Sequence, residues 1–278
     1  MEAAIGNTRI AFVGGGNMAR ALIAGLVRQG TAAAQIRVGE PDVDHRGLLA
    51  RDYGVQSAAD NAAAVAGAGI IVLAVKPQEM ARVAAALAPG LTGGAPLLLS
   101  VAAGITTADL ARWYPGAAVV RAMPNRPALL GAGITGLYAP ATVGAAPRAL
   151  AEAVMAAAGR TVWVQRESDL DTVTALSGSG PAYFFLLAEE MAAAGVALGL
   201  DPTTAQLLAA ETLHGAGQLA HADPALDRQR IAVTSRGGTT EAALGEFAAG
   251  GLAGLVRRAV EAAARRSAEL ARQFGTGS

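Results

Sequence analysis

The stretch VGGGNMARALIAGLVRQG, residues 13–30, decides the fold that we expect for this chain, and it continues the short apolar run RIAFV at 9–13. Within it, Gly14, Gly16 and Ala19 fit the pattern G-x-G-x-x-A between a predicted strand and a predicted helix. The first glycine permits a tight turn, the second lets the backbone approach a pyrophosphate, and the small third residue lets the helix pack closely. Because a helix N-terminus also attracts anions, the stretch predicts a dinucleotide site.

Short β-branched runs alternate with helix-like stretches through the first part of the chain. The runs lie at 9–14, 36–40, 70–75, 96–102, 118–123 and 161–165. Such alternation is typical of βαβ units around a parallel sheet. From 169 to 274 the sequence is alanine-rich and helical, with glycine and proline punctuation at 199–202 and 221–227.

We therefore expect an α/β protein of two domains. An N-terminal Rossmann-type parallel-sheet domain is predicted at 1–165, and an all-helical dimerisation and substrate-binding domain at 166–278. The segment 122–150, which contains several glycines and prolines, gives no clear assignment.

Composition excludes several classes of function. The chain has 278 residues, enough for two domains, and its 22 basic residues balance 22 acidic ones. Without net charge, neither nucleic acid nor an anionic membrane is an expected partner. The sequence has no cysteine, which excludes disulfides and thiol catalysis, and its histidines, His45, His214 and His221, form no zinc-binding spacing. We expect no metal.

The sequence also bears on where the protein acts. Its first residues, MEAAIGNTRI, lack the basic segment and apolar run of a secretion signal. The apolar run at 70–75 has the length of a strand and is far too short to span a membrane. These observations predict a cytoplasmic protein.

Glu40 ends the second predicted strand, 21 residues after Ala19. An acidic residue at this distance binds the adenosine ribose of NAD, and its charge would repel the 2′-phosphate of NADP. His45 and Arg46 follow closely and would weaken that bias. The alternative is that Glu40 is a solvated loop acid, so the choice between NAD and NADP stays open.

Lys76 is the only lysine in the chain and lies in LAVKPQ, at the carboxyl end of a predicted buried strand. Ligands of open α/β sheets bind at that edge. Asn61 and the loop SVAAG at 100–104 fall where the same ligand would be met. From chemistry alone, a chance placement of Lys76 and ordinary turn roles for the other residues are equally good readings.

Two further clusters of hydroxyls and glycines precede helices. In ALSGSGPAYFF at 175–185, Ser177, Ser179 and Gly180 are suited to cap a helix whose first turn contains Pro181. Capping accounts for one hydroxyl, and the surplus hydroxyls and glycines are either turn residues or bring the backbone close to a ligand.

In VTSRGGTTEAAL at 233–244, the successive N–H groups of Gly238, Thr239 and Thr240 would form a cradle for a carboxylate. A capping loop would explain one threonine with Glu241 nearby, but not the whole cluster. We therefore favour substrate binding for this loop.

Six motifs together carry a resemblance to a known family. They are VGGGNMARALIAGL, LAVKPQ, SVAAGI, RAMPNRPALLGAGITGL, LSGSGPAYFF and VTSRGGTTEAAL, and in this order and spacing the chain resembles the pyrroline-5-carboxylate reductases over nearly its whole length. The resemblance implies hydride transfer from NADPH or NADH to the C=N bond of 1-pyrroline-5-carboxylate, a small cyclic imine, giving L-proline. It also implies self-association through the helical domain, as a dimer or a ring of dimers in which dimers carry the complete active sites.

The resemblance and the patterns above lead to one set of predicted site residues. The predicted cofactor-binding residues are Gly14, Gly16, Asn17, Met18, Glu40, Asn61, Ala74, Val75, Lys76, Pro77, Ala102, Ala103 and Asn125. The predicted substrate-binding residues are Glu167, Ser235, Gly237, Gly238, Thr239 and Thr240. The resemblance implies that the Thr240 hydroxyl hydrogen-bonds the ring nitrogen, which makes it the predicted catalytic residue, and that no histidine need be catalytic.

The chain departs from the family pattern at two positions. Arg126 replaces the threonine usual in MPNTP, and Arg236 replaces the proline usual in TSPGG. Both changes add charge near a predicted anion site and put the range of substrates in doubt.

Three other functions compete with this reading. A β-hydroxyacid dehydrogenase would need a lysine in the helical domain, and the sequence has none after Lys76. A reductase of a different cyclic imine would keep the whole pattern. A non-catalytic dinucleotide-binding regulator would keep the loop at Gly14 but would not need the GGTT loop.

Overall fold

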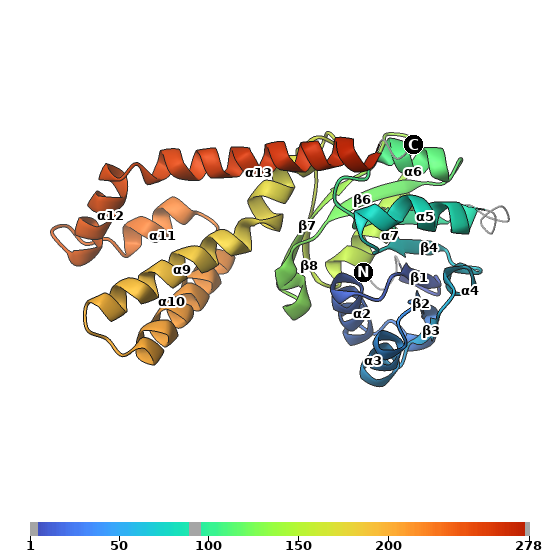
Figure 1. Ribbon diagram of the computed structural model, residues 1–278, viewed down its shortest axis with the longest axis horizontal. Coiled ribbons are helices and arrows are strands. Elements are labelled where there is room, and N and C mark those ends of the chain that lie inside the picture. Colours follow the sequence, from blue (N-terminus) through green and yellow to red (C-terminus); the bar gives the residue numbers. More distant parts are fainter. Residues whose placement is uncertain (1–4, 89–95, 276–278) are drawn as a thin grey trace. The chain divides into compact units, whose positions relative to one another are not determined.

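The computed structural model describes residues 5–88 and 96–275, and this part of the chain contains an eight-stranded sheet (Figure 1). The strand order is β3-β2-β1-β4-β5-β6-β7-β8. The strands are β1 (Ile10–Val13), β2 (Ile36–Gly39), β3 (Gln56–Ala58), β4 (Ile70–Leu73), β5 (Leu97–Ser100), β6 (Val119–Met123), β7 (Gly133–Tyr138) and β8 (Gly159–Trp163). All neighbouring strands run parallel except β6 and β7, which are antiparallel.

Helices cover both faces of the sheet. One apolar core joins the sheet to α2 (Asn17–Arg28), α3 (Val43–Tyr53) and α7 (Ala145–Ala156). The other joins it to α4 (Asn61–Val65), α5 (Pro77–Leu87) and α6 (Thr107–Trp113). Helix α2 packs closely against the end of α7, since a Cβ on Gly25 would lie 2.0 Å from the carbonyl oxygen of Ala157.

The fold class is confirmed, and two strands were missed. All six predicted strands are present, with small shifts at their ends. β3 was missed because its three residues, QSA, have no apolar pattern. β7 lies in the unassigned segment 122–150, where two glycines in GITGLY weaken the strand signal.

The chain divides into two compact units, and the division differs from the predicted boundary at residue 165. Unit 1 comprises Met1–Gly178 and Ala263–Ser278, and unit 2 comprises Ser179–Ala262. The segment α8 (Asp169–Val173) stays with the sheet because its Leu170 is buried and its Val173 packs closely on Gly136 of β7. Helix α13 (Leu252–Gly275) begins in unit 2 and ends in unit 1, where Ser267 donates a hydrogen bond to Asp171 (2.7 Å). The first four residues, part of the segment that predicted no secretion signal, lie outside the described residues.

Unit 2 is helical throughout. Its elements are α9 (Gly180–Ala197), α10 (Pro202–Ala222), α11 (Leu226–Ala232), α12 (Thr239–Ala249) and the first part of α13. α9 packs on α10 through small residues, since a Cβ on Gly195 would lie 3.4 Å from the Cβ of Ala205. Alongside the exposed Glu189 and Glu190, α9 carries uncovered apolar side chains: Phe184 is 60 % exposed and Leu186 is 57 % exposed. Large apolar side chains that cluster on an exposed surface mark an interaction site, so this surface needs a partner.

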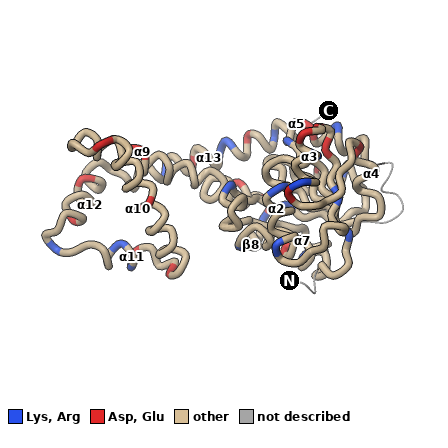
Figure 2. The backbone as a smooth tube through the Cα atoms, turned by 90° about the horizontal axis from the view of Figure 1, so that it is seen from below, with Lys and Arg blue, Asp and Glu red and all other residues tan. Residues whose placement is uncertain are grey.

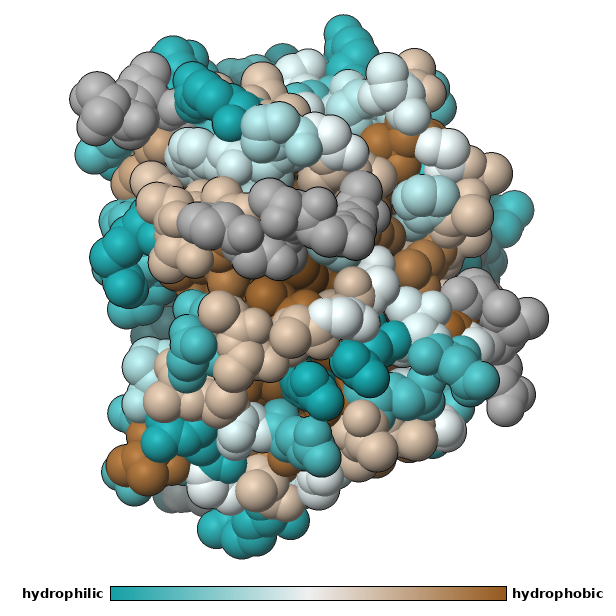
Figure 3. Space-filling model, turned by 90° about the vertical axis from the view of Figure 1, so that its right-hand side faces the viewer, coloured by the Kyte–Doolittle hydropathy of each residue, from teal (hydrophilic) through white to brown (hydrophobic). Residues whose placement is uncertain are grey.

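Charge is dispersed over the described chain. Figure 2 shows acidic and basic residues interspersed along the backbone of both units. The face of unit 1 that carries α4 and α5 intermixes hydrophilic and hydrophobic side chains (Figure 3). Within residues 5–88 and 96–275, no helix combines the length and the apolar composition needed to cross a bilayer.

Candidate functional site

The loops that leave the parallel strands meet at the carboxyl edge of the sheet. The N–H of Gly14 donates to the carbonyl oxygen of Gly39 (2.8 Å), and the N–H of Ala74 donates to that of Val13 (2.9 Å). Strand order reverses between β1 and β4, and doubly wound sheets bind ligands at such a switch point. The fold thus brings the predicted loops at Gly14, Glu40 and Ala74 together.

The glycine loop has the geometry that a pyrophosphate requires. Gly14 has φ +96°, and a Cβ there would lie 2.8 Å from the carbonyl oxygen of Ala74, so no other residue fits. Gly16 has open space where its Cβ would be. Helix α2 begins at Asn17, after the N-cap residue Gly16, and no side chain caps its first turn, so its leading N–H groups remain available to an anion.

Asn61 offers a second feature that fits a bound dinucleotide. It is the first residue of α4 and packs against Gly39, where a Cβ would lie 2.2 Å from the Asn61 Oδ1. That Oδ1 is buried and has no hydrogen-bond partner among the described residues. A buried polar atom without a partner is costly, so this oxygen is suited to accept a hydrogen bond from a ligand. The open Gly16, the uncapped α2 and this oxygen together fit a dinucleotide.

Lys76 lies at the same edge of the sheet. It is exposed at the start of α5, directly before Pro77, and Ala74 and Val75 precede it after β4. Its position leaves the ammonium group free to approach an anion.

The carboxylate of Glu40 is enclosed by the backbone. Its Oε2 accepts from the N–H of Gly15 (2.8 Å) and its Oε1 from the N–H of Asp42 (3.0 Å). Arg46 donates to the carbonyl oxygens of Glu40 and Pro41, both at 2.8 Å. His45 is exposed on α3, and its N–H donates to Asp42, which lowers the pKa of that carboxyl.

Ala102 and Ala103 lie in the loop after β5, where the N–H of Ala102 donates to the hydroxyl of Ser100 (3.3 Å). Asn125 lies after β6 and is buried. Its amide donates to the carbonyl oxygen of Ser177 (3.1 Å) and accepts from the N–H of Ile134 (3.0 Å). The Asn125 side chain therefore holds three chain segments together.

Glu167 joins two segments that lie far away in the sequence. It accepts from the N–H and the hydroxyl of Thr107, both at 2.7 Å, and from the guanidinium of Arg121 at 2.8 Å. Thr107 and Arg121 are both buried. The family resemblance pointed to Glu167 alone, and Thr107 and Arg121 were missed because nothing in the local sequence marks them.

The predicted capping by Ser177 and Ser179 is wrong. Residues Thr174–Gly178 form a π-helical turn directly after α8, and the Ser177 hydroxyl donates to the carbonyl oxygen of Val173 (2.9 Å). Ser179 precedes α9 but its side chain makes no capping hydrogen bond, and the N–H of Ala182 donates to its carbonyl oxygen (3.0 Å). Pro181 lies in the first turn of α9, as predicted. π-Helical turns are often found at functional sites.

The GGTT loop in unit 2 forms the uncapped N-terminus of α12. Gly237 has φ +71°, and its N–H donates to the carboxylate of Glu241 (2.6 Å). The N–H of Gly238 donates to the carbonyl oxygen of Ser235 (3.0 Å). No side chain caps α12, so the leading N–H groups at Thr239 and Thr240 are available to an anion.

The remaining features singled out in the sequence are two arginines and the histidines. Arg126 starts the short helix η3 (Arg126–Leu130), and Arg236 is exposed in the GGTT loop. His214 pairs with Gln218 on α10. Within the described residues, no group of three or more potential metal-binding side chains is present.

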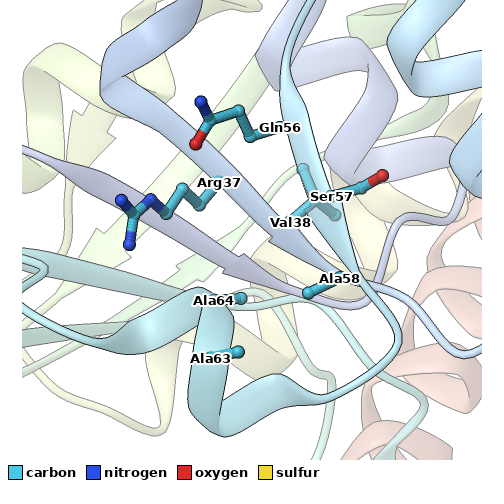
Figure 4. Close-up of a pocket in the computed structure, with 7 residues that line it drawn as sticks. All are labelled: Arg37, Val38, Gln56, Ser57, Ala58, Ala63 and Ala64. Carbon is cyan, nitrogen blue, oxygen red and sulfur yellow. The ribbon is translucent and has the colours of Figure 1, made fainter.

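A pocket lies between β2, β3 and α4 (Figure 4). Its lining consists of Arg37, Val38, Gln56, Ser57, Ala58, Ala63 and Ala64. None of these belongs to the predicted cofactor or substrate set. We therefore do not assign this pocket to the candidate site.

Comparisons with known proteins give one consistent result. Residues 167–270 match a family model described as pyrroline-5-carboxylate reductase dimerisation, and residues 9–104 match one described as NADP oxidoreductase coenzyme F420-dependent. The chain is 49 % identical to a pyrroline-5-carboxylate reductase of Pseudomonas aeruginosa, covering 96 % of this chain and 98 % of that protein. It is 42 % identical to the same enzyme of Haemophilus influenzae, covering 95 % and 98 %.

Solved structures agree with these relatives. A pyrroline-5-carboxylate reductase from Coxiella burnetii superposes with a TM-score of 0.91 at 39 % identity, covering 95 % of this chain and 98 % of that one. A pyrroline carboxylate reductase from Plasmodium falciparum with NADP bound superposes with a TM-score of 0.81 at 26 % identity, covering 95 % and 98 %.

Proposed function

The chain belongs to the pyrroline-5-carboxylate reductase family, and on this premise we propose that the glycine loop of unit 1 holds the cofactor and the GGTT loop of unit 2 holds the substrate. The protein is an NAD(P)H-dependent oxidoreductase that reduces the C=N bond of 1-pyrroline-5-carboxylate to L-proline, the last step of proline biosynthesis. The observation that carries the proposed cofactor site is Gly14 against Ala74 at the switch point of the sheet, beside an α2 N-terminus that no side chain caps.

Each group at the cofactor edge has a proposed task. The N–H groups at Asn17 and Met18 would bind the pyrophosphate, and the free Oδ1 of Asn61 would accept from a ribose hydroxyl. When bound, the reduced nicotinamide supplies the hydride. Ala102 and Ala103 line the neighbouring loop with small side chains, which leaves room for a flat ring.

The substrate carries a carboxylate and an imine nitrogen, and the GGTT loop can bind both. The N–H groups of Thr239 and Thr240 would bind the carboxylate at the start of α12, whereas the N–H of Gly238, which the sequence also pointed to, is already held by the carbonyl oxygen of Ser235. Glu241 shapes this cradle by holding the N–H of Gly237. The Thr240 hydroxyl would then hydrogen-bond the ring nitrogen and orient the C=N bond for hydride attack.

The chain self-associates through its helical region, which matches the dimerisation model. The exposed apolar side chains of α9, including Phe184, Phe185 and Leu186, supply a surface that a second copy would bury. We propose that the assembly is a dimer or a ring of dimers, that it acts in the cytoplasm, and that it binds neither nucleic acid nor membrane. Size measurement in solution and cell fractionation test these finer proposals.

The test of the substrate site follows the absorbance of the reduced nicotinamide with pyrroline-5-carboxylate, using NADH and NADPH in turn. Thr240→Ala should lower kcat/KM by an amount equivalent to about 1 to 3 kcal/mol, with cofactor affinity retained. The matched control is Thr234→Ala, which removes a hydroxyl that already donates to the carbonyl oxygen of Arg230. Equal kinetics for Thr240→Ala and wild type would remove Thr240 from the mechanism, and turnover of another cyclic imine alone would change the assigned substrate.

A further inference from the structure

Glu40 is more enclosed than a residue that reads a ribose should be. The residue is only 8 % exposed. Its Oε2 accepts a hydrogen bond from the N–H of Gly15, and its Oε1 accepts one from the N–H of Asp42. The Gly15 contact links two loops that are 25 residues apart in the sequence. The negative charge of Glu40 is therefore directed at the protein backbone.

Close packing holds this arrangement from both sides. A Cβ on Gly15 would lie 2.8 Å from Leu49 Cδ1 and 3.2 Å from Glu40 Oε2, so the glycine loop rests directly on Glu40 and α3. Arg46 then fixes the chain after β2 by donating to the carbonyl oxygens of Glu40 and Pro41. Because Gly15 lies between Gly14 and Gly16, the Glu40 contact controls the shape of the whole loop.

We propose that Glu40 is a positioning residue, which holds the glycine loop in the shape that binds pyrophosphate and so supports NADH and NADPH equally. This inference rests on the proposed cofactor site. It differs from the expectation that Glu40 selects NAD, since the residue is only 8 % exposed and both of its oxygens are turned to backbone N–H groups, which leaves little of the carboxylate to meet the 2′ position of the ribose. Pyrophosphate is common to both cofactors, so a change in loop shape must affect both.

The experiment compares three variants with wild type by isothermal titration with NAD⁺ and with NADP⁺. Glu40→Ala removes both acceptors. Glu40→Gln keeps the side-chain volume and one acceptor oxygen, but its amide NH₂ group faces the second backbone N–H and cannot accept a hydrogen bond from it. The control, Asp44→Ala, removes one negative charge four residues after Glu40, at an exposed carboxylate in the first turn of α3.

Glu40→Ala should raise the dissociation constants of NAD⁺ and NADP⁺ together by about tenfold, which corresponds to about 1.4 kcal/mol. Glu40→Gln should lie between Glu40→Ala and wild type, and Asp44→Ala should match wild type. In steady-state kinetics, Glu40→Ala should raise the KM for the cofactor and leave the KM for the imine unchanged. Hydrogen exchange in the protein without cofactor should show the Gly15 amide exchanging about tenfold faster, or more, in Glu40→Ala than in wild type.

Two results would overturn the proposal. One is a change of fivefold or more in the ratio of the two dissociation constants in Glu40→Ala, on the order of 1 kcal/mol, which would make Glu40 a selector. The other is a Gly15 amide that exchanges equally fast in Glu40→Ala, in Glu40→Gln and in wild type. If wild type itself binds neither nucleotide, the cofactor site is wrong, and the exchange of the Gly15 amide still decides the role of Glu40.

Discussion

The ion pair between Glu167 and Arg121 offers a quantitative test of how unit 1 is held together. Glu167→Ala removes three hydrogen bonds of 2.7, 2.7 and 2.8 Å, from the Thr107 N–H, the Thr107 hydroxyl and Arg121. It also leaves the Arg121 guanidinium, whose side chain is 10 % exposed, without its carboxylate. Breaking a fully buried pair in this way costs about 3 to 5 kcal/mol.

The expected loss is smaller here because solvent reaches one partner. The Glu167 side chain is 25 % exposed, so water can enter the space that it leaves and hydrate Arg121 in part. We therefore expect Glu167→Ala to lower the free energy of unfolding by about 2 to 3 kcal/mol. The matched control is Glu79→Ala, which breaks an exposed pair with Arg82 and should cost less than about 1 kcal/mol.

The assay is urea unfolding followed by circular dichroism, with all variants at one protein concentration because self-association adds to stability. Arg121→Met combined with Glu167→Ala should recover part of the loss, since it removes the uncompensated charge. An effect of Glu167→Ala no larger than that of Glu79→Ala would refute this reasoning. A raised KM for the imine without a loss of stability would instead support the predicted role of Glu167 in substrate binding.

Three further outcomes are expected. Gly14→Ala should abolish measurable cofactor binding in a titration with NAD⁺, because φ is +96° and the new Cβ would lie 2.8 Å from the carbonyl oxygen of Ala74; binding at wild-type affinity would contradict the site. Tyr114 has a buried hydroxyl with no partner among the described residues, and burial raises its pKa, so the stability of the wild type should fall as the pH rises above about 10. In urea titrations, Tyr114→Phe should be about 1 kcal/mol more stable than wild type at neutral pH and should not show that fall. Hydrogen bonds from Arg166 lower the pKa of Asp169, so the stability that they contribute is present above about pH 4 and is lost as the pH falls through the lowered pKa. The difference in Tm between wild type and Asp169→Asn should therefore shrink toward about pH 3. A difference in Tm that stays constant with pH would count against a stabilising role for this pair.

The sequence by itself determined the features that depend on local pattern. Apolar runs of strand length predicted six strands, and the spacing of Gly14, Gly16 and Ala19 predicted the turn, because a positive φ and close packing each demand a small residue at a defined position. The fold class and the family followed from the same patterns. The short polar strand β3 and the glycine-containing strand β7 escaped prediction because neighbouring strands, and not their own residues, stabilise them.

Only the tertiary structure decided the partners of the polar side chains. Glu40 meets Gly15 across 25 residues, and Glu167 meets Thr107 across 60 and Arg121 across 46. The same carboxylate could be solvated, bind a ligand or brace a loop, and the outcome depends on which donors the folded chain brings within hydrogen-bond distance. Ser177 shows the same limit, since whether its hydroxyl caps a helix or bonds the preceding turn depends on the conformation of the residues before it. Residue type sets what a side chain can do, and the packing of distant segments selects which of those interactions forms.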